Sequence, residues 1–291
     1  MFRKTLAAVI TYHPDIAGVQ SNILTYSEAV DRILVWLNSD EMLSAEWDTP
    51  ELAAAREKIV FLGAGGGNVG IGRALNEAVR MGVADGYEYI LTMDQDSRWE
   101  NAGAYLSAVA QYADDPMAGI FTPSIDRGDG QMLPFNGHDT IQSGAVFRLS
   151  MFRTTGLFNE SYFVDSTDHE FCYRAGDAGF RIVKVDAGLL RHHLGYARPI
   201  PGTRYMSENY SSARLFYLYR SFVWIRRFYP KKIQNECYRH FFKDTFLCRF
   251  KWILLGEDHK AAKLWAIVRG ISAGLLTRPA PAPELSRGGI S

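Results

Sequence analysis

Short apolar runs alternate with amphipathic segments in the amino-terminal third of the chain. The runs are bounded by turn residues and have the length of strands, at residues 6–12, 32–37, 59–62 and 88–93. The segments between them have the apolar spacing of helices, at residues 16–29, 50–56 and 72–84. Strands that alternate with helices predict a mostly parallel sheet with helices on both faces, which is an α/β fold.

The pattern changes after residue 96. It predicts a helix at 102–112, a strand at 119–123, and a loop at 126–136 that is rich in Gly, Asp and Pro. Residues 141–190 mix short strands with one helix, and the chain reads as helical from 207 almost to 276. We therefore divide it into a catalytic-type domain at 1–206, a helical region at 207–277 and a tail at 278–291. The Pro and Gly content of the tail predicts disorder.

The composition is that of an ordinary folded protein. The chain has 291 residues, of which 47% are hydrophobic and 22% charged, so it can bury a substantial core. Three scattered cysteines are too few for a disulfide framework and indicate a reducing compartment, so we expect a cytoplasmic protein. Residues 1–12 are interpreted as the first strand and not as a signal peptide, because the apolar part is short. No apolar window reaches the length of a spanning helix.

The formal net charge of zero conceals an asymmetry. Residues 214–278 contain 14 Lys and Arg against 4 Asp and Glu, whereas the residues before 214 contain 17 against 27. The basic segment is also rich in aromatic and aliphatic residues, a combination that is typical of a helix at a membrane interface. The alternatives are a helical layer with a solvated basic face and a contact that makes a homodimer. We expect no nucleic-acid partner.

Two acidic residues, Asp94 and Asp96, follow directly on the apolar run at 89–93. Residues i and i+2 of a strand share a face, so both carboxylates should point the same way. Carboxylates about 4 Å apart repel by about 4 kcal/mol at an effective dielectric constant of about 20, so a divalent cation or a proton is expected between them. Ligands bind beyond the carboxyl ends of strands in α/β sheets, and the pair therefore predicts a metal-bridged phosphate. The alternative is a solvated acidic turn in which Ser97 caps a helix.

Residues 65–70 match G-x-G-x-x-G between a predicted strand and a predicted helix, which is the pattern of a dinucleotide-binding loop. The acidic residue expected about 20 positions later would be Asp85 or Glu88, which do not end the next strand. Two other interpretations are a loop that passes close to a phosphate or sugar and a tight turn that binds nothing. An NAD-dependent oxidoreductase is thus the rival class of enzyme.

The chain resembles the inverting family 2 glycosyltransferases, and specifically their bacterial rhamnosyltransferase-like branch, over about residues 5 to 230. The motifs that carry the resemblance are residues 11–15 (TYHPD), 68–76 (NVGIGRALN), 89–97 (YILTMDQDS), 142–144 (QSG), 162–175 (YFVDSTDHEFCYRA), 192–195 (HHLG) and 214–221 (RLFYLYRS). The chain departs from the family pattern at His13, at the incomplete acidic element Asn38-Ser39-Asp40, and at Ser221. These departures concern the contacts to the donor base and the role of Arg220.

The resemblance implies a glycosyltransferase A-type fold, Rossmann-like and mostly parallel, with a helical basic carboxyl-terminal region. It implies that a nucleotide-sugar lies across the carboxyl edge of the sheet, with its base near Thr11 and Tyr12. The residues implied to contact this donor are Thr11, Tyr12, Asn38, Asn68, Gly70, Asn76, Asp94 and Gln95. Mg²⁺ or Mn²⁺ would be bound by Asp96, with Asp94 and His192 as further ligands, since oxygen ligands suit these hard ions.

Asp168 is the implied catalytic base, which takes the proton of the acceptor hydroxyl from the face opposite the leaving group. The residues implied to contact the acceptor are Gln142, Ser143, Gly144, Asp165 and Glu170, although Asp165 and Glu170 could instead pair with Arg174. The expected reaction moves L-rhamnose from dTDP-rhamnose to a saccharide or lipid-linked acceptor in bacterial surface polysaccharide (O-antigen) synthesis, on the inner face of the membrane. A UDP-sugar donor is the alternative within the family.

Overall fold

The protein was analysed as a computed structural model, which describes residues 4–39, 47, 49–63, 65, 67–127, 130–192, 198–200, 202–203, 206–234, 239 and 242–285. The motif residues Asp40, Gly66 and 193–195 lie outside the described residues. The strands are β1 (Thr5–Thr11), β2 (Arg32–Leu37), β3 (Ile59–Gly63), β4 (Tyr89–Asp94), β5 (Ser97–Glu100), β6 (Ala118–Asp126), β7 (Val146–Arg148), β8 (Arg181–His192), β9 (Arg198–Pro199) and β10 (Met206–Ser207). The helices are α1 (Ile16–Leu24), α2 (Ile71–Ala84), α3 (Ala102–Ala110), α4 (Phe152–Thr155), α5 (Thr167–Asp177), α6 (Ser212–Phe228), α8 (Arg249–Gly256) and α9 (Lys260–Leu276).

The described strands form an eight-stranded sheet in the order β3-β2-β1-β4-β7-β6-β8-β5, and a separate two-stranded sheet of β9 and β10. The pairs β3-β2, β2-β1, β1-β4 and β6-β8 are parallel. The pairs that include β7, and the pair β8-β5, are antiparallel. The predicted alternation of strands and helices is confirmed for β1 to β4. Strands β1, β2 and β4 are almost continuously apolar because both faces of the sheet are covered there.

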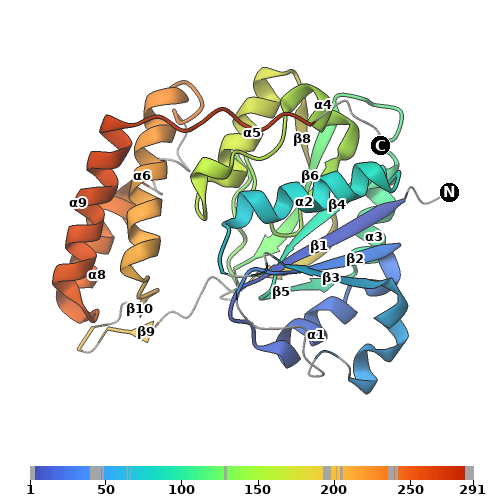
Figure 1. Cartoon of the computed structure of the whole chain (residues 1–291), viewed down its shortest axis with the longest axis horizontal. Helices are drawn as coiled ribbons and strands as arrows, with labels where there is room; N and C mark the ends of the chain where they lie inside the picture. Colours follow the sequence, from blue (N-terminus) through green and yellow to red (C-terminus); the bar gives the residue numbers. More distant parts are fainter. Residues whose placement is uncertain are drawn as a thin grey trace.

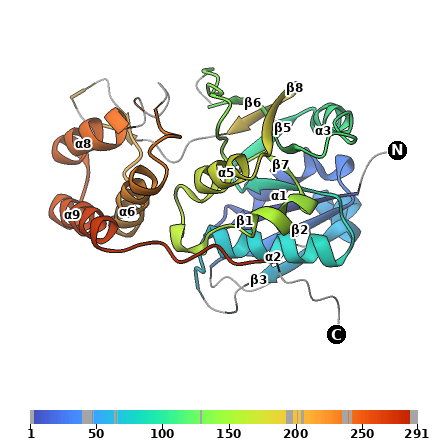
Figure 2. The same ribbon diagram turned by 90° about the horizontal axis from the view of Figure 1, so that it is seen from above.

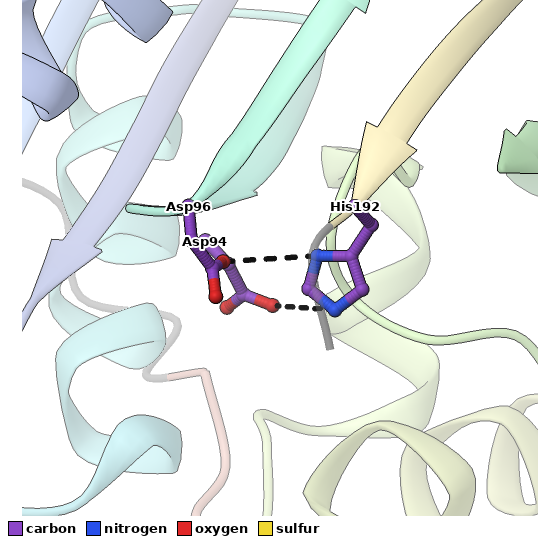
Figure 3. Close-up of side chains that lie close together, drawn as sticks. All are labelled: Asp94, Asp96 and His192. Carbon is purple, nitrogen blue, oxygen red and sulfur yellow. Dashed lines mark ion pairs between the residues drawn. The ribbon is translucent and has the colours of Figure 1, made fainter. Parts of the chain in front are cut away.

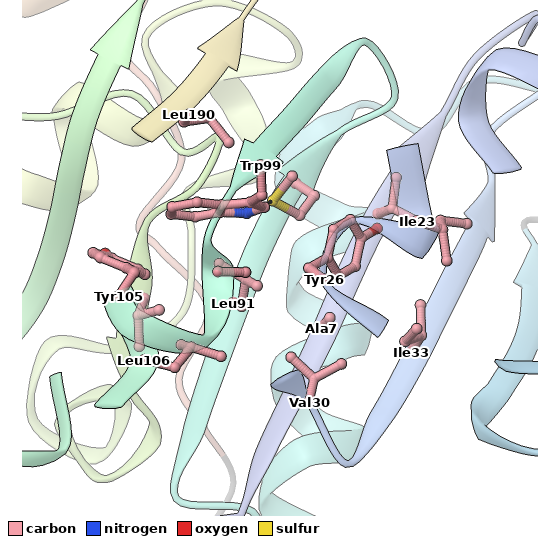
Figure 4. Packing of buried hydrophobic residues seen from close by; sticks show 14 of the residues in the cluster. Ala7, Ile23, Tyr26, Val30, Ile33, Leu91, Trp99, Tyr105, Leu106 and Leu190 are labelled. Atoms are coloured by element: carbon pink, nitrogen blue, oxygen red, sulfur yellow. Dashed lines mark hydrogen bonds between the residues drawn. The ribbon is translucent and has the colours of Figure 1, made fainter. Parts of the chain in front are cut away.

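Helices cover the two faces of the large sheet and create two apolar clusters (Figures 1 and 2). On one face, α1 and α3 pack against the strands, with Ile23, Tyr105 and Leu106 among the buried side chains (Figure 4). On the other face, Leu75 of α2, Phe152 of α4 and Phe171 of α5 are fully buried. The carboxyl edge of the central strands is left between these layers.

The carboxyl-terminal helices form their own apolar cluster beside the sheet domain (Figure 1). The glycines of α9 allow a close approach to α6, since a Cβ at Gly274 would lie 2.6 Å from Cβ of Val223. Trp224 and Ile225 of α6 pack against Tyr162 and against Tyr173 of α5, which joins the helical region to the domain. Among the described residues, no helix has both the length and the apolar character that crossing a bilayer requires.

The tail differs from the prediction. Residues 278–285 run back from α9 to the sheet domain, where they lie extended (Figures 1 and 2). The Leu157 N–H donates to the Pro283 carbonyl (2.8 Å), Asn159 Nδ2 donates to the Ala280 carbonyl (2.9 Å), and the Ala280 N–H donates to Ser161 Oγ (2.9 Å). The prediction of disorder is wrong for these residues. It rested on the Pro and Gly content of the tail, whereas the tail is held through its backbone N–H and carbonyl groups, which do not depend on side-chain type. Residues 286–291 are outside the described part.

Three local predictions also needed correction. Residues 50–58 form a 3-10 helix, and the predicted helix 16–29 ends as α1 at Leu24 before a short 3-10 turn at Ser27–Ala29. Ser97 begins strand β5 and does not cap a helix, so the alternative interpretation of the Asp94-Asp96 turn is wrong. The pairing of β5 with β8 explains this, because it supplies long-range hydrogen bonds that no local pattern announces.

Candidate active site at the carboxyl edge of the sheet

Three side chains that suit a metal ion meet at the end of β4 (Figure 3). Asp94 ends β4, Asp96 lies in the turn to β5, and His192 ends β8. The antiparallel register of β5 and β8 places His192 opposite Ser97, although the two residues are 95 positions apart in the sequence. One ligand atom from each of Asp94, Asp96 and His192 lies within 4.8 Å of the others.

Buried hydroxyl groups orient the ring of His192. Oγ of Ser97 lies 2.6 Å from Nδ1 of His192 and 2.6 Å from Oγ of Ser143. The Nε2 atom is turned towards Asp94, with 3.9 Å between Nε2 and Oδ2, while Nδ1 lies 3.7 Å from Oδ1 of Asp96. A hydrogen bond to one ring nitrogen fixes the orientation of the other, which is how metal-binding histidines are commonly held. The donor set therefore fits a divalent cation.

Burial and neighbouring carboxylates disfavour the charged form of Asp94. Burial raises the pKa of Asp94 to about 8, with Asp96 and Asp168 adding to the rise and Arg214 opposing it. Gln142 Nε2 donates to Oδ1 of Asp94. Without a cation, this carboxyl group shares a negative site with two others, and a divalent ion would favour its ionised form.

Asp168 lies in the first turn of α5, and the segment before β7 holds it near Asp94. The Gln142 N–H donates to Oδ2 of Asp168 (3.2 Å), and the Gln142 side chain binds Asp94, so one residue contacts both carboxylates. Gln142 and Ser143 are buried, and Ser143 Oγ accepts from the Asp94 N–H (3.2 Å). We expected Gln142, Ser143 and Gly144 to contact the acceptor. The structure instead places Gln142 and Ser143 beneath the carboxylates as supports.

Gly144 has a positional reason of its own. Its φ is +75°, and a Cβ there would lie 2.7 Å from Cδ2 of Leu190. The Gly144 N–H donates to the Thr92 carbonyl (2.8 Å), which ties the loop to β4. The glycine is thus required for the backbone conformation that presents Gln142 to both acids.

The other two predicted acceptor residues are already paired. Asp165 binds Arg214 of α6, with 3.1 Å between Oδ1 and Nη2. Glu170 is only 2% exposed; its Oε2 lies 2.9 Å from Nη2 of Arg174, and its Oε1 accepts from the Tyr229 hydroxyl (2.8 Å). Glu170 therefore joins α5 to α6 and is not available to an acceptor. Its pairing with Arg174 confirms the alternative interpretation.

On the donor side, Tyr12 and Gln95 are brought together. The Tyr12 N–H donates to Oε1 of Gln95 (2.7 Å), and Nε2 of Gln95 donates back to the Tyr12 carbonyl (3.2 Å). The ring of Tyr12 is exposed beside that of His13, with 4.3 Å between the centroids. Thr11 is fully buried, and its hydroxyl donates to the Trp36 carbonyl (3.0 Å). Of Thr11 and Tyr12, it is therefore Tyr12 whose side chain is accessible to the base of a nucleotide.

A second network joins the end of β2 to the start of α2. Asn38 Nδ2 donates to Oδ1 of Asn68 (2.9 Å), and the same oxygen accepts from the Gly70 N–H (2.8 Å). Gly70 has a φ of +82° and lies against Phe163, where a Cβ would be 2.8 Å from the ring. Asn38, Asn68 and Gly70 are therefore brought together at the same edge of the sheet.

Asn76 is not brought to the site. It is completely buried, and it exchanges two hydrogen bonds with the backbone of Phe158: Nδ2 to the carbonyl (3.0 Å) and Oδ1 from the N–H (2.8 Å). Its Nδ2 also donates to Oε1 of Glu160 (2.9 Å). The motif that includes Asn76 thus ends in a residue that fastens α2 to the segment before α5.

The geometry of α2 is unfavourable for a dinucleotide. The glycine loop precedes the helix, whereas Asp85 and Glu88 follow it at the opposite edge of the sheet. A helix of 14 residues is about 21 Å long, so neither carboxylate can reach the ribose of a nucleotide at the loop. Asp85 and Glu88 therefore cannot serve as the acidic residue of a dinucleotide site at this loop.

Sequence reasoning assigned no role to several residues that the structure brings to the site. His169 and Arg214 belong to the family motifs at 162–175 and 214–221, but the sequence did not indicate which residues they contact. Asn22, which donates to the Gln95 carbonyl (2.9 Å), and Asp139, which lies beside His169, had no local signal. Only their tertiary contacts identify them.

A scan against known protein families gives no match. Among curated proteins, the chain is 27% identical over 212 residues to the dTDP-rhamnosyl transferase RfbF of Shigella flexneri, which covers 65% of this chain and 69% of the relative. This similarity and the motif order confirm the predicted resemblance to rhamnosyltransferase-like family 2 glycosyltransferases.

Solved structures support the same fold. S. aureus TarS aligns with a TM-score of 0.54 at 12% identity, over 94% of this chain and 44% of that chain. TarS 1–349 in complex with UDP-GlcNAc gives a TM-score of 0.54 at 14% identity, over 93% of this chain and 81% of that one. GalNAc-T7 with UDP, GalNAc and Mn²⁺ gives 0.58 at 11% identity, over 90% and 58%. The predicted A-type fold is confirmed, and the chain spans less than half of the first of these TarS chains.

Proposed function

We propose that this glycosyltransferase moves L-rhamnose from dTDP-L-rhamnose, with inversion, to a hydroxyl group of a saccharide or lipid-linked acceptor. The observation that carries the proposal is the cluster of Asp94, Asp96 and His192 at the carboxyl edge of the sheet, joined to Asp168 through Gln142. A cation site and a carboxylate base on either side of one sugar are the parts that such a transfer needs. The similarity to RfbF supports dTDP-rhamnose as the donor.

Asp94, Asp96 and His192 would hold Mn²⁺ or Mg²⁺, which would neutralise the charge of the departing nucleoside diphosphate. Tyr12 and Gln95 would contact the base, and the network of Asn38 and Asn68 would shape the loop beneath the donor. Asp168 accepts the proton of the acceptor hydroxyl as that oxygen bonds to the anomeric carbon and the bond to the phosphate oxygen breaks. Because the attack comes from the face opposite the diphosphate, the configuration inverts.

A UDP-sugar is the second candidate donor. The TarS structure with UDP-GlcNAc, and that of GalNAc-T7 with UDP, favour it at the level of fold. The acceptor would belong to a bacterial surface polysaccharide of the O-antigen kind, made on the cytoplasmic side of the membrane.

The carboxyl-terminal helices support a peripheral contact with that membrane. Large apolar side chains of α8 and α9 are exposed, with Trp265 62% exposed; the others are Leu254, Leu255, Val268, Leu275 and Leu276. The charged residues of α9 are Lys260, Lys263 and Arg269, and none is acidic. Lys263 is buried and paired with Glu257 (2.7 Å), so Lys260 and Arg269 are the basic residues of α9 at the surface. Apolar side chains with basic neighbours match an anionic bilayer, and each basic residue near the surface adds about 1 kcal/mol. The alternative occupant, a second copy, would bring like charges together.

Calorimetric titration with dTDP, UDP, GDP and NAD, each with and without Mn²⁺, tests the proposal. We expect dTDP to bind in a metal-dependent manner. Metal-dependent binding of UDP alone would replace the donor and keep the class. Metal-independent binding of NAD would overturn the proposal.

A further inference from the structure

His169 is a charged neighbour of the proposed base that the mechanism above does not use. It follows Asp168 in the first turn of α5, and its side chain is 34% exposed. Its Nδ1 lies 3.4 Å from Oδ2 of Asp139, a residue of the loop that leads to Gln142. The histidine therefore follows the proposed base in the chain and places its ring against a carboxylate from another part of the fold.

Asp139 is held firmly in place. Its carboxylate accepts hydrogen bonds from the Tyr173 hydroxyl (2.6 Å) and from Nδ2 of Asn136 (2.6 Å), and its N–H donates to Oδ1 of Asn136 (3.0 Å). Burial alone would raise the pKa of Asp139, but the charge of His169 and these hydrogen bonds hold it well below its usual range. Asp139 is thus a fixed anion against which an imidazolium can rest.

The electrostatics of His169 point the same way. Burial alone would lower the pKa of His169, but the carboxylates of Asp168 and then Asp139, with Asp165 further off, raise it to about 9. At neutral pH the ring is therefore an imidazolium. Asp168 is the first of the attractive charges, ahead of Asp139.

The other charges around Asp168 are mostly negative. Asp94 lies on the β4 side, and Asp165 in the preceding turn is balanced by Arg214 of α6. Two N–H groups, from Gln142 (3.2 Å) and His169 (2.9 Å), donate to the Asp168 carboxylate. A bound nucleoside diphosphate would bring further negative charge, which favours the protonated and inactive form of a base.

We propose that His169 is a positioning residue, an imidazolium between Asp139 and Asp168 that keeps the base ionised and oriented while the negatively charged donor is bound. The inference rests on the proposed function of Asp168. It explains why the Asp139 carboxylate, held by hydrogen bonds from Tyr173 and Asn136, lies against the ring of His169. It also assigns a role to the loop at residues 136–142, which carries both Asp139 and Gln142.

The rate of transfer as a function of pH tests this role. With saturating donor, acceptor and Mn²⁺, we expect His169→Gln to move the acid limb of kcat to higher pH by about one to two units, which is the usual effect of one neighbouring charge. Above the shifted limb, kcat should return to within about threefold of the wild type. Asp139→Asn should shift the limb in the same direction, and His138→Gln, in the same loop, should not shift it.

A loss of rate in His169→Gln that is equal at every pH would mean a structural role and would overturn the inference, as would an unchanged profile.

A second measurement needs no transfer activity. In the metal-free protein, NMR should show one histidine that titrates near pH 9, absent in His169→Gln. Its midpoint should fall by about one unit in Asp168→Asn and also in Asp139→Asn. A midpoint that ignores Asp168→Asn contradicts the inference. Failure of the wild type to transfer any sugar contradicts the proposed function instead, so the two failures are distinguishable.

Discussion

At the scale of single residues, the site depends on side chains that are themselves hidden. Gln142 contacts both Asp94 and Asp168, and Ser97 links Ser143 to His192, although Gln142, Ser97 and Ser143 are all buried. Acids this close repel, so neutral donors must fix their geometry before a cation or substrate arrives. The residues that could touch a ligand are therefore fewer than the motifs suggested.

Replacing Asp168 with Asn removes the proposed base and keeps the size of the side chain. We expect kcat to fall by about 10² to 10⁴, the usual contribution of a general base, while donor affinity changes little. Transfer assays and calorimetry with the donor and Mn²⁺ measure the two quantities. Asp177→Asn, at the exposed end of the same helix, is the matched control.

Transfer within tenfold of the wild type in Asp168→Asn would retire Asp168 as the base. Loss of donor binding in that variant would mean that the residue acts on the donor and not on the acceptor.

At the scale of elements, α2 connects the glycine loop (residues 65–70) to the core. Its first residues follow Gly70, which lies against Phe163, and its buried Asn76 binds the backbone of Phe158. The helix therefore couples the glycine loop to the segment that leads into α5 and Asp168, the proposed base. This coupling depends on polar groups within an apolar layer, where an unpaired partner is costly.

Replacing Asn76 with Ala leaves the N–H and carbonyl of Phe158 without their partners. We expect the free energy of unfolding to fall by about 1 to 3 kcal/mol, because buried polar groups lose their hydrogen bonds. Denaturant unfolding measures the change. Glu77→Ala, on a partly exposed position of the same helix, should change stability much less.

The affinity of the folded Asn76→Ala protein for the nucleotide should match that of the wild type. A variant with normal stability and weakened nucleotide binding would restore Asn76 as a donor contact.

At the scale of the whole molecule, several contacts join the helical region to the sheet domain. Trp224 and Ile225 pack against Tyr162 and Tyr173. Arg214 pairs with Asp165, three residues before the proposed base, and the tail returns to Leu157. The exposed apolar face of α9 points away from these joints, because α6 covers its other face. A membrane that contacts the exposed face of α9 would thus lie away from these connections. It would leave the site undisturbed.

The double substitution Trp265→Ser and Val268→Ser tests this contact. A large apolar side chain contributes about 1.5 to 3 kcal/mol when it is buried, so vesicle binding should weaken at least tenfold. Sedimentation with vesicles of anionic and of neutral lipid, at low and high salt, measures it. Met117→Ser, an exposed apolar residue of the sheet domain, is the control.

Binding that neither lipid charge nor the double variant affects would contradict the membrane contact. Self-association without lipid, abolished by the same variant, would assign the face to a second copy.

The sequence by itself determined the alternation of β1 to β4 with their helices, the acidic pair at the end of β4, and the order of the family motifs. These are local properties, because apolar periodicity and motif spacing depend only on residues that are close together in the sequence. The strands after Asp96 were less visible, because β5, β7 and β8 are stabilised by pairing across long separations.

Only the tertiary structure decided which motif residues face the site. It placed His192 beside Asp94, paired Glu170 with Arg174, buried Asn76, and returned the tail at Pro283 to the sheet domain. Such outcomes depend on hydrogen bonds and ion pairs between segments that are distant in sequence, and the same residue types could have faced solvent in another packing. The physical reason is that a side chain's chemistry is local, whereas its partners are set by the fold.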